Sequence, residues 1–264
     1  MLPKLKFEKY YKKFYIEPHN IYVRIKSENY SFIYRSSDYD DLNMMCRENL
    51  AFWESKSRKI FSQLSKTTNV VFDIGSYSGI YTLLAAKSNN DVKTYSFEPN
   101  PELFKVLSKN IKINRLKNSK IETLALDENE GVATLYINHE RFSSAASLKK
   151  NSNQGASFQV KKTTLDSFVA SEKITTIDLM KIDVEGYEIN VLKGSLKSLT
   201  DFQPIILMES LSKESLLEQK SYLTKFGYQT PIQIQGDGFD LNNWLWFAEK
   251  DASKVKSVID FPLI

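Results

Sequence analysis

The chain has 264 residues, of which 42% are hydrophobic and 26% are charged, a balance typical of a globular protein and not of a disordered or fibrous one. A net charge of +4 is too small to predict a nucleic-acid partner, and a single cysteine, Cys46, excludes an intrachain disulfide. No apolar run approaches the ~20 residues that a transmembrane helix needs, and lysines interrupt any signal-peptide core at the start of the chain, so we expect a cytoplasmic protein.

Residues 1–68 are predicted to form a small α/β appendage, which we expect to act as a lid or as a cap on the acceptor side. Alternating polar and apolar residues over 21–36 indicate two strands about a turn, and the apolar stripe of 40–66 indicates a helix. The basic start, KLKFEKYYKKFY, is most simply a solvated face. The alternative is peripheral contact with an anionic membrane or an acidic glycan.

From residue 69 the chain alternates short apolar strands with helices, which predicts a domain over 69–264 with a mostly parallel sheet covered on both faces. Residues 132–138 and 158–163 are expected to pair as an antiparallel excursion. Two final strands, 228–235 and 242–250, replace the last crossover and predict an antiparallel edge strand. The expected parallel strands are 70–74, 94–98, 120–126, 177–183 and 204–210, with helices after Gly79, Pro101, Gly186 and Ser210.

Such sheets bind ligands beyond the carboxyl ends of their strands, where the strand order reverses. The first of these ends carries DIGSYSG, residues 73–79. Its glycines allow a tight turn and let a ligand approach the backbone, and the free amides at the start of the next helix suit an anionic group such as a carboxylate. The predicted cofactor-binding residues of this loop are Asp73, Gly75, Ser76, Tyr77 and Gly79.

The second strand ends at Glu98, in FEPNP. A carboxylate beside the glycine loop can accept both hydroxyls of a ribose, and Asn100 is expected to orient the adenosine. Tyr77 stands where a dinucleotide fingerprint has its second glycine, which argues against NAD and for a nucleoside cofactor without a pyrophosphate, such as S-adenosylmethionine. The alternative is a Rossmann-like domain with tight turns and no cofactor.

A third polar segment, ALDENEG, covers residues 125–131. Asp127 is expected to accept a hydrogen bond from the exocyclic amine of adenine, beside the amides of Leu126 and Glu128. The alternative is an acidic turn that faces solvent.

Carboxylates gather after the last two parallel strands. Asp183 and Glu185 follow the fourth strand, and Glu209 ends the fifth beside it. Asp183 or Glu185 is the first candidate for a general base, and His139, in the excursion, is the second. We predict no metal site, although Asp183, Glu185 and Glu209 are the residues that would hold a divalent cation. The alternative is that Glu185 and Glu188 complement the dipole of the helix that starts there.

In order and spacing these segments resemble the FkbM-type methyltransferases over residues 50 to about 249. The resemblance implies a seven-stranded class I methyltransferase fold, S-adenosylmethionine as the donor, and methyl transfer to a hydroxyl of a sugar, polyketide or similar metabolite. It also implies that the glycine loop and Glu98 hold the cofactor. Ser76-Tyr77 departs from the Ala-Asn common in the family, which we expect to alter the methionine end of the pocket. The segments that carry the resemblance are FWES, DIGSYSGIYTLLAA, SFEPNP, ALDENEG, TTLDSF, IDLMKIDVEGYEINVLKG and PIILMES.

Methyl transfer from a sulfonium is an in-line displacement, so the enzyme must align an acceptor oxygen and remove its proton. We therefore expect an O-methyltransferase with a small-molecule or glycan acceptor and no nucleic-acid partner. Three alternatives remain: a nicotinamide oxidoreductase, a catalytically silent cofactor-binding protein, and a nucleic-acid 2′-hydroxyl methyltransferase. The last would use Lys181 with Asp183 and would need a strongly basic face.

Overall fold

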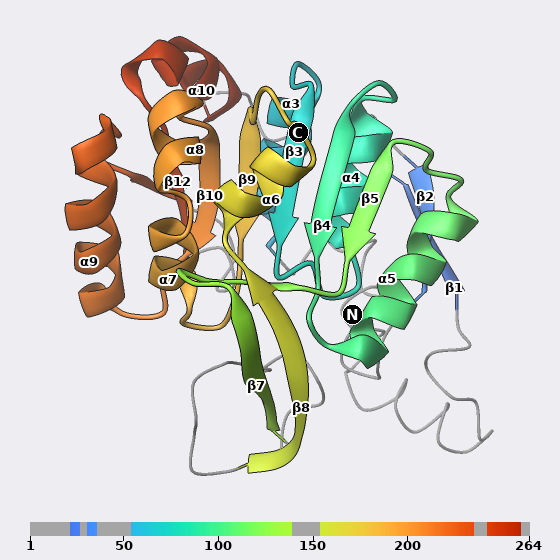
Figure 1. Cartoon of the computed structure of the whole chain (residues 1–264). Coiled ribbons are helices and arrows are strands. Elements are labelled where there is room, and N and C mark those ends of the chain that lie inside the picture. Colours follow the sequence, from blue (N-terminus) through green and yellow to red (C-terminus); the bar gives the residue numbers. More distant parts are fainter. Residues whose placement is uncertain (1–21, 27–30, 36–53, 139–153, 235–241, 260–264) are drawn as a thin grey trace, which may run out of the picture.

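The computed structural model of the chain describes residues 22–26, 31–35, 54–138, 154–234 and 242–259. Its centre is a seven-stranded sheet in the order β11-β12-β10-β9-β3-β4-β5 (Figure 1). Five strands pair in parallel, and β12 pairs antiparallel with both β10 and β11. The predicted fold class, a mostly parallel seven-stranded sheet with an antiparallel edge, is confirmed. The strands in sheet order are β11 (Ile232–Gln233), β12 (Asn243–Trp246), β10 (Ile205–Glu209), β9 (Leu179–Ile182), β3 (Val70–Ile74), β4 (Lys93–Phe97) and β5 (Ser119–Glu122).

Helices cover both faces of this sheet because the central strands are apolar on both sides. Successive residues of a strand point to opposite faces, so Val71 and Leu179 belong to one core, while Phe72 and Met180 belong to the other. The first core is closed by α3 (Ser55–Ser65), α4 (Ile80–Ser88) and α10 (Ala252–Ile259). The second is closed by α6 (Leu165–Ser171), α7 (Glu188–Lys193), α8 (Leu196–Asp201) and α9 (Lys213–Leu223), which a short 3-10 turn, Thr224–Phe226, extends.

An N-terminal hairpin of β1 (Tyr22–Lys26) and β2 (Ser31–Arg35) lies against α5 (Pro101–Ile113). Two asparagines, Asn110 in α5 and Asn114 at its C-terminal cap, take the place of a further strand beside β2. Asn110 bonds the N–H and the C=O of Arg35, and Asn114 bonds those of Ile33. The hairpin and α3 contribute to the same core as α4 and β3. The described part of 1–68 is thus packed on the main sheet, and its separation as an appendage stays a prediction.

The predicted strand 120–126 is wrong as a single element. β5 ends at Glu122, and β6 (Ala125–Leu126) pairs instead with β8 (Gln154–Thr163) in a three-stranded sheet of order β6-β8-β7. β7 (Gly131–Asn138) and β8 form the predicted antiparallel excursion. This β7–β8 hairpin projects beyond the edge of the molecule toward which the parallel strands run (Figure 1).

The predicted helix after Gly186 is divided between α7 and α8 at Gly194. A Cβ atom on Gly194 would lie 2.0 Å from the carbonyl oxygen of Asp127, so the chain packs backbone against backbone here and bends. The spacing of apolar residues in this segment predicts Leu196 on the core face, but the structure leaves Leu196 57% exposed, so that prediction is wrong. The first part of the predicted helix 40–66 lies outside the described residues, and α6 and α10 were absent from the sequence prediction. Among the described helices, none has the length and apolar character that crossing a membrane requires.

Candidate active site

The glycine loop after β3 is shaped by contacts with the neighbouring strands. The amides of Gly75 and Ser76 both donate to the carbonyl of Phe97, at 3.0 and 2.9 Å. Gly75 has φ +78°, and a Cβ there would lie 1.8 Å from the carbonyl oxygen of Asp183. Gly79 has φ +90°, and its Cβ would lie 2.4 Å from a methyl group of Leu107. Gly75 therefore needs glycine because of both its positive φ and its contact with the backbone, and Gly79 chiefly because of its positive φ.

Glu98 lies directly beneath this loop. One carboxylate oxygen accepts the amide of Tyr77 at 2.8 Å, and the other accepts the amide of Asn100 at 2.8 Å. Burial raises the pKa of Glu98 to about 8, against the lowering effect of these two hydrogen bonds. Each oxygen has a second lone pair, so the carboxylate keeps one acceptor position per oxygen for a pair of hydroxyls.

The side chains of Asp73 and Ser76 hold the loop in shape. One oxygen of Asp73 accepts hydrogen bonds from the amide and the hydroxyl of Thr82, at 2.9 and 2.5 Å, and thereby ties the end of β3 to α4. Burial raises the pKa of Asp73 to about 6, and the hydrogen bonds from Thr82 oppose this shift. The hydroxyl of Ser76 donates to the carbonyl of Asp73 at 2.6 Å. A direct contact of either side chain with a cofactor stays a prediction.

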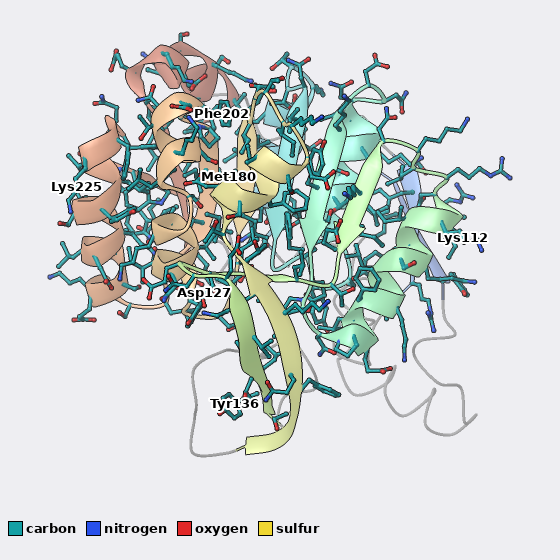
Figure 2. All side chains as sticks on the ribbon, viewed as in Figure 1. Lys112, Asp127, Tyr136, Met180, Phe202 and Lys225 are labelled. Atoms are coloured by element: carbon teal, nitrogen blue, oxygen red, sulfur yellow. The ribbon has the colours of Figure 1, made fainter. Side chains whose placement is uncertain are left out.

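Asn100 and Asp127 also have structural partners. Asn100 caps α5, because its side chain accepts the amide of Glu102 at 3.0 Å. Asp127 is buried where the β7–β8 hairpin leaves the main body (Figure 2) and forms an ion pair with Lys162. It is therefore not a turn that faces solvent. The preceding Leu126 is buried as well. Their roles toward adenosine stay predictions.

Polar side chains replace apolar ones where the α4-side face of the sheet reaches its carboxyl end. In the register of the sheet, Lys181 of β9 lies between Asp73 of β3 and Leu207 of β10. One step further along, Glu209 pairs with Asn243 of β12. Because alternate residues share a face, the side chains of Lys181 and Asp183 emerge together. The ammonium of Lys181 donates to Asp183 at 3.0 Å.

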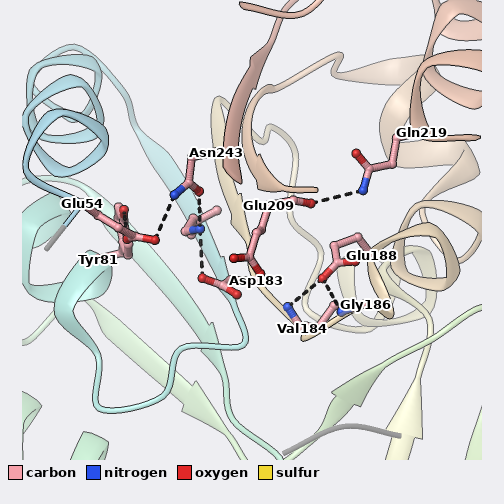
Figure 3. A network of polar contacts seen from close by, with 10 residues as sticks. Glu54, Tyr81, Asp183, Val184, Gly186, Glu188, Glu209, Gln219 and Asn243 are labelled. Carbon is pink, nitrogen blue, oxygen red and sulfur yellow. Dashed lines mark hydrogen bonds and ion pairs between the residues drawn. The ribbon is translucent and has the colours of Figure 1, made fainter. Parts of the chain in front are cut away.

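Lys181, Asp183 and Asn243 form one hydrogen-bonded network with Glu54, the residue before α3 (Figure 3). Lys181 donates to the side-chain oxygen of Asn243 at 3.0 Å, and the Asn243 amide donates to Glu54 at 2.9 Å. The hydroxyl of Tyr81 donates to the other oxygen of Glu54 at 2.6 Å. Burial raises the pKa of Glu54, although Lys181 acts to lower it.

The electrostatics of this network centre on Lys181. Burial acts to lower its pKa, but Asp183, Glu54 and Glu209 together raise it above its usual range. Burial, with the charge of Asp183 next to it, raises the pKa of Glu209 to about 9. Lys181 therefore stays charged, and Glu209 is protonated at neutral pH. Within the described ranges no group of three or more His, Cys, Asp or Glu residues is arranged to hold a metal ion; the cation among these carboxylates is the Lys181 ammonium.

The two glutamates that follow β9 have different surroundings: Glu185 lies in the loop and Glu188 is the first residue of α7. Glu188 is buried and accepts the amides of Val184 and Gly186, at 3.3 and 2.9 Å (Figure 3). It thereby stabilises the loop, and it stands in the first turn of α7; the predicted complement to the helix dipole stays a prediction. Glu185 stands in the left-handed region with φ +53°, directly before Gly186. The structure brings Asp183 and Glu209 into one electrostatic cluster with Glu185, while His139 lies outside the described residues.

Sequence reasoning missed three members of this network: Glu54, Tyr81 and Asn243. Glu54 was noted only as part of FWES, and Tyr81 and Asn243 stand in segments that look like ordinary core elements. Lys181 carried a detectable signal, because a lysine inside the strand LMKI interrupts an otherwise apolar run. A buried lysine needs a partner, and that partner could have been sought at the strand ends.

The doubly wound sheet, the glycine turn after β3 and the carboxylate after β4 define a class I, Rossmann-like methyltransferase fold. Residues 73–230 match the Methyltransferase FkbM domain, which is more than half of the chain. The chain therefore belongs to the FkbM methyltransferase family. The resemblance described from the sequence is confirmed.

Two similar proteins illustrate the match. The hexuronic acid methyltransferase AglP of Haloferax volcanii is 26% identical over 150 residues, which cover 56% of this chain and 59% of that protein. The aligned part is thus less than two thirds of the relative's length. The solved structure of methyltransferase FkbM from Methylobacillus flagellatus KT superposes with a TM-score of 0.50 and 14% identity, over 68% of this chain and 43% of that one. This second likeness bears on the fold alone.

Proposed function

We propose that the chain is an S-adenosylmethionine-dependent O-methyltransferase that acts on a hydroxyl of a sugar, a glycan or a similar metabolite. The observation that carries the donor assignment is Glu98, whose two oxygens each keep one acceptor position beneath the Gly75 turn. Membership of the FkbM family supports methyl transfer. The similarity to a protein named a hexuronic acid methyltransferase favours a carbohydrate acceptor.

The residues present fit the nucleoside part of this donor. The carboxylate of Glu98 would accept the two ribose hydroxyls, with the backbone of Gly75 and Tyr77 beside it. Leu126 and Asp127 would border the adenine, and Asn100 would fix the loop through its capping bond. When bound, S-adenosylmethionine supplies a methyl group that is already activated by a positively charged sulfur.

Proton removal is assigned to the carboxylates after β9. The side chain of Asp183 is 26% exposed, whereas its partner Lys181 is only 1% exposed, so Asp183 is the member of the pair that an acceptor can reach. We propose Asp183 as the group that accepts the hydroxyl proton of the acceptor. Glu185 and His139 remain the alternative bases.

A titration with S-adenosylhomocysteine tests the donor assignment. We expect micromolar binding by the wild type, and a loss of at least ~30-fold in affinity for Glu98→Ala, because two charge-assisted hydrogen bonds disappear. Glu122→Ala is the matched control, since the side chain of this glutamate forms an ion pair with Lys120 on the neighbouring strand β5, and its affinity should equal that of the wild type. Absence of binding by the wild type would refute the assignment.

The acceptor is identified by a second experiment on the same protein. Labelled S-adenosylmethionine is incubated with uronic acids, neutral sugars and nucleotide sugars, and label transfer is measured. We expect transfer to a carbohydrate hydroxyl that falls at least ~100-fold in Asp183→Asn. Transfer to RNA in place of every carbohydrate would contradict the proposed acceptor class.

A further inference from the structure

Lys181 is a buried charge that the proposed reaction does not yet use. It is 1% exposed and stands on the central strand β9. Its ammonium bonds Asp183 and Asn243, both at 3.0 Å, and lies 5.1 Å from the centre of the Tyr81 ring. Burying an ammonium is costly unless its partners compensate, so an apolar residue would be the simpler choice for this strand.

The partners of Lys181 fix its direction. Asn243 accepts from Lys181 through its oxygen and donates to Glu54 through its nitrogen, so its amide cannot flip without losing both bonds. Glu54 is fixed in turn by the hydroxyl of Tyr81 (Figure 3). The ammonium of Lys181 is therefore held between Asn243 and Asp183, and one of its three donors bonds the Asp183 carboxylate.

Asp183 is the end of this network that reaches solvent. Glu54 and Asn243 are buried, as is Lys181, while the Asp183 side chain is partly exposed. The backbone of Asp183 also touches the cofactor loop, because a Cβ on Gly75 would collide with its carbonyl oxygen. The network thus ends in a carboxylate placed beside the candidate donor site.

We propose that Lys181 is a positioning residue for methyl transfer: pinned by Asn243 and Glu54, its ammonium holds the Asp183 carboxylate in one place beside the Gly75 turn. This inference rests on the proposed function. Asp183 takes the proton of the acceptor hydroxyl while the acceptor oxygen bonds the methyl carbon. The carbon–sulfur bond breaks with its electron pair left on the sulfur, so charge and atoms balance.

Lys181→Met tests the proposal because methionine keeps an unbranched chain and removes the charge. With the acceptor found by the screen, we expect kcat to fall at least ~30-fold while the Kd for S-adenosylhomocysteine changes less than threefold. In an Asp183→Asn background the same change should lower kcat by less than about twofold, since Lys181 acts through Asp183. Full additivity of the two losses would overturn the proposal.

A second variant covers the case in which Lys181→Met does not fold. Asn243→Ala removes the hydrogen bond that Lys181 donates to Asn243 and leaves the Lys181–Asp183 pair intact. We expect a loss of kcat smaller than that in Lys181→Met, with an unchanged Kd for S-adenosylhomocysteine. Lys197→Met is the matched control, because Lys197 pairs with Asp201 on the exposed surface of α8, and it should behave as the wild type. A kcat equal to that of the wild type in Asn243→Ala would contradict the claim that Asn243 holds Lys181 in position.

Crystal structures of the wild type and the variants test whether Lys181 positions the Asp183 carboxylate, and they need no acceptor. In the wild type we expect one conformer of the Asp183 carboxylate, bonded to Lys181. In Lys181→Met, or in Asn243→Ala, we expect that carboxylate to be displaced or split between conformers. An unchanged single conformer in the variant would overturn the proposal even where S-adenosylhomocysteine binds, whereas absence of that binding in the wild type counts against the proposed function alone.

Discussion

At the scale of single residues, the proposed role of Glu98 as the ribose acceptor would make cofactor binding depend on pH. Burial raises its pKa to about 8 in the free protein, so the carboxyl is mostly protonated at neutral pH. Two ribose hydroxyls that donate to it would favour the ionised form and lower its pKa. Binding should then release a proton, and affinity for S-adenosylhomocysteine should rise with pH up to about 8, by at most about tenfold per unit.

Calorimetry in two buffers with different heats of ionisation measures this release directly. We expect up to one proton released per ligand at pH 7, and none in Glu98→Gln, which cannot ionise. Equal affinity of the wild type at pH 6 and pH 8.5, without proton release, would count against Glu98 as the ribose acceptor.

At the scale of elements, α5 secures β2 through side chains in place of a strand. Asn114 bonds the N–H of Ile33 at 2.9 Å and also its carbonyl, so Asn114→Ala leaves two backbone groups without that partner. Such groups cost about 1–3 kcal/mol each when buried. We expect faster hydrogen exchange at Ile33 and a lower thermal midpoint. Asn118→Ala is the control, since Asn118 lies on an exposed turn; equal protection of Ile33 in both variants would contradict this role.

A helix or strand could be predicted where the residues of that segment alone determine its structure, and not where contacts with distant parts of the sequence determine it. Val70–Ile74 and Leu179–Ile182 are apolar except for Asp73 and Lys181, and each is followed by a turn that contains glycine, so the sequence predicts their place in a central parallel sheet. The division of the segment 120–126 could not be predicted, because it follows from pairing of Ala125 with Lys162, 37 residues away in sequence. The break at Gly194 likewise depends on Asp127.

The residues of the candidate site also divide into those that the sequence predicts and those that only the fold brings together. Glu98 and Asp183 stand at strand ends, where topology alone directs the search. Glu54 and Asn243 are 189 residues apart, and nothing local marks either of them as polar members of a buried network. Only the fold brings them together.

At the scale of the whole molecule, buried carboxyls set how stability depends on pH. Asp73, Glu98 and Glu209 have pKa values of about 6, 8 and 9 in the folded protein, against about 4 in an unfolded chain. The folded state therefore binds more protons between these values, and the free energy of unfolding falls as pH rises through that range. Each group contributes at most about 1.4 kcal/mol per pH unit.

Thermal unfolding at constant ionic strength checks the sign. We expect a higher Tm at pH 6 than at pH 8.5, and a smaller difference in Glu98→Gln, because one of the three groups no longer titrates. A Tm that is higher at pH 8.5 than at pH 6 would contradict this prediction, because groups other than Asp73, Glu98 and Glu209 would then determine how stability depends on pH.

The segment that matches the FkbM domain, residues 73–230, does not include all the residues that surround its buried lysine, Lys181. Glu54 precedes the 73–230 segment and Asn243 follows it, yet both belong to the polar network around Lys181, a buried lysine at the centre of that segment. A fragment cut at the family boundaries would keep the buried ammonium and discard two of its neighbours. Chimeras and shortened versions of this protein should therefore be joined outside residues 54–246, so that Glu54 and Asn243 are kept together with the strand that carries Lys181.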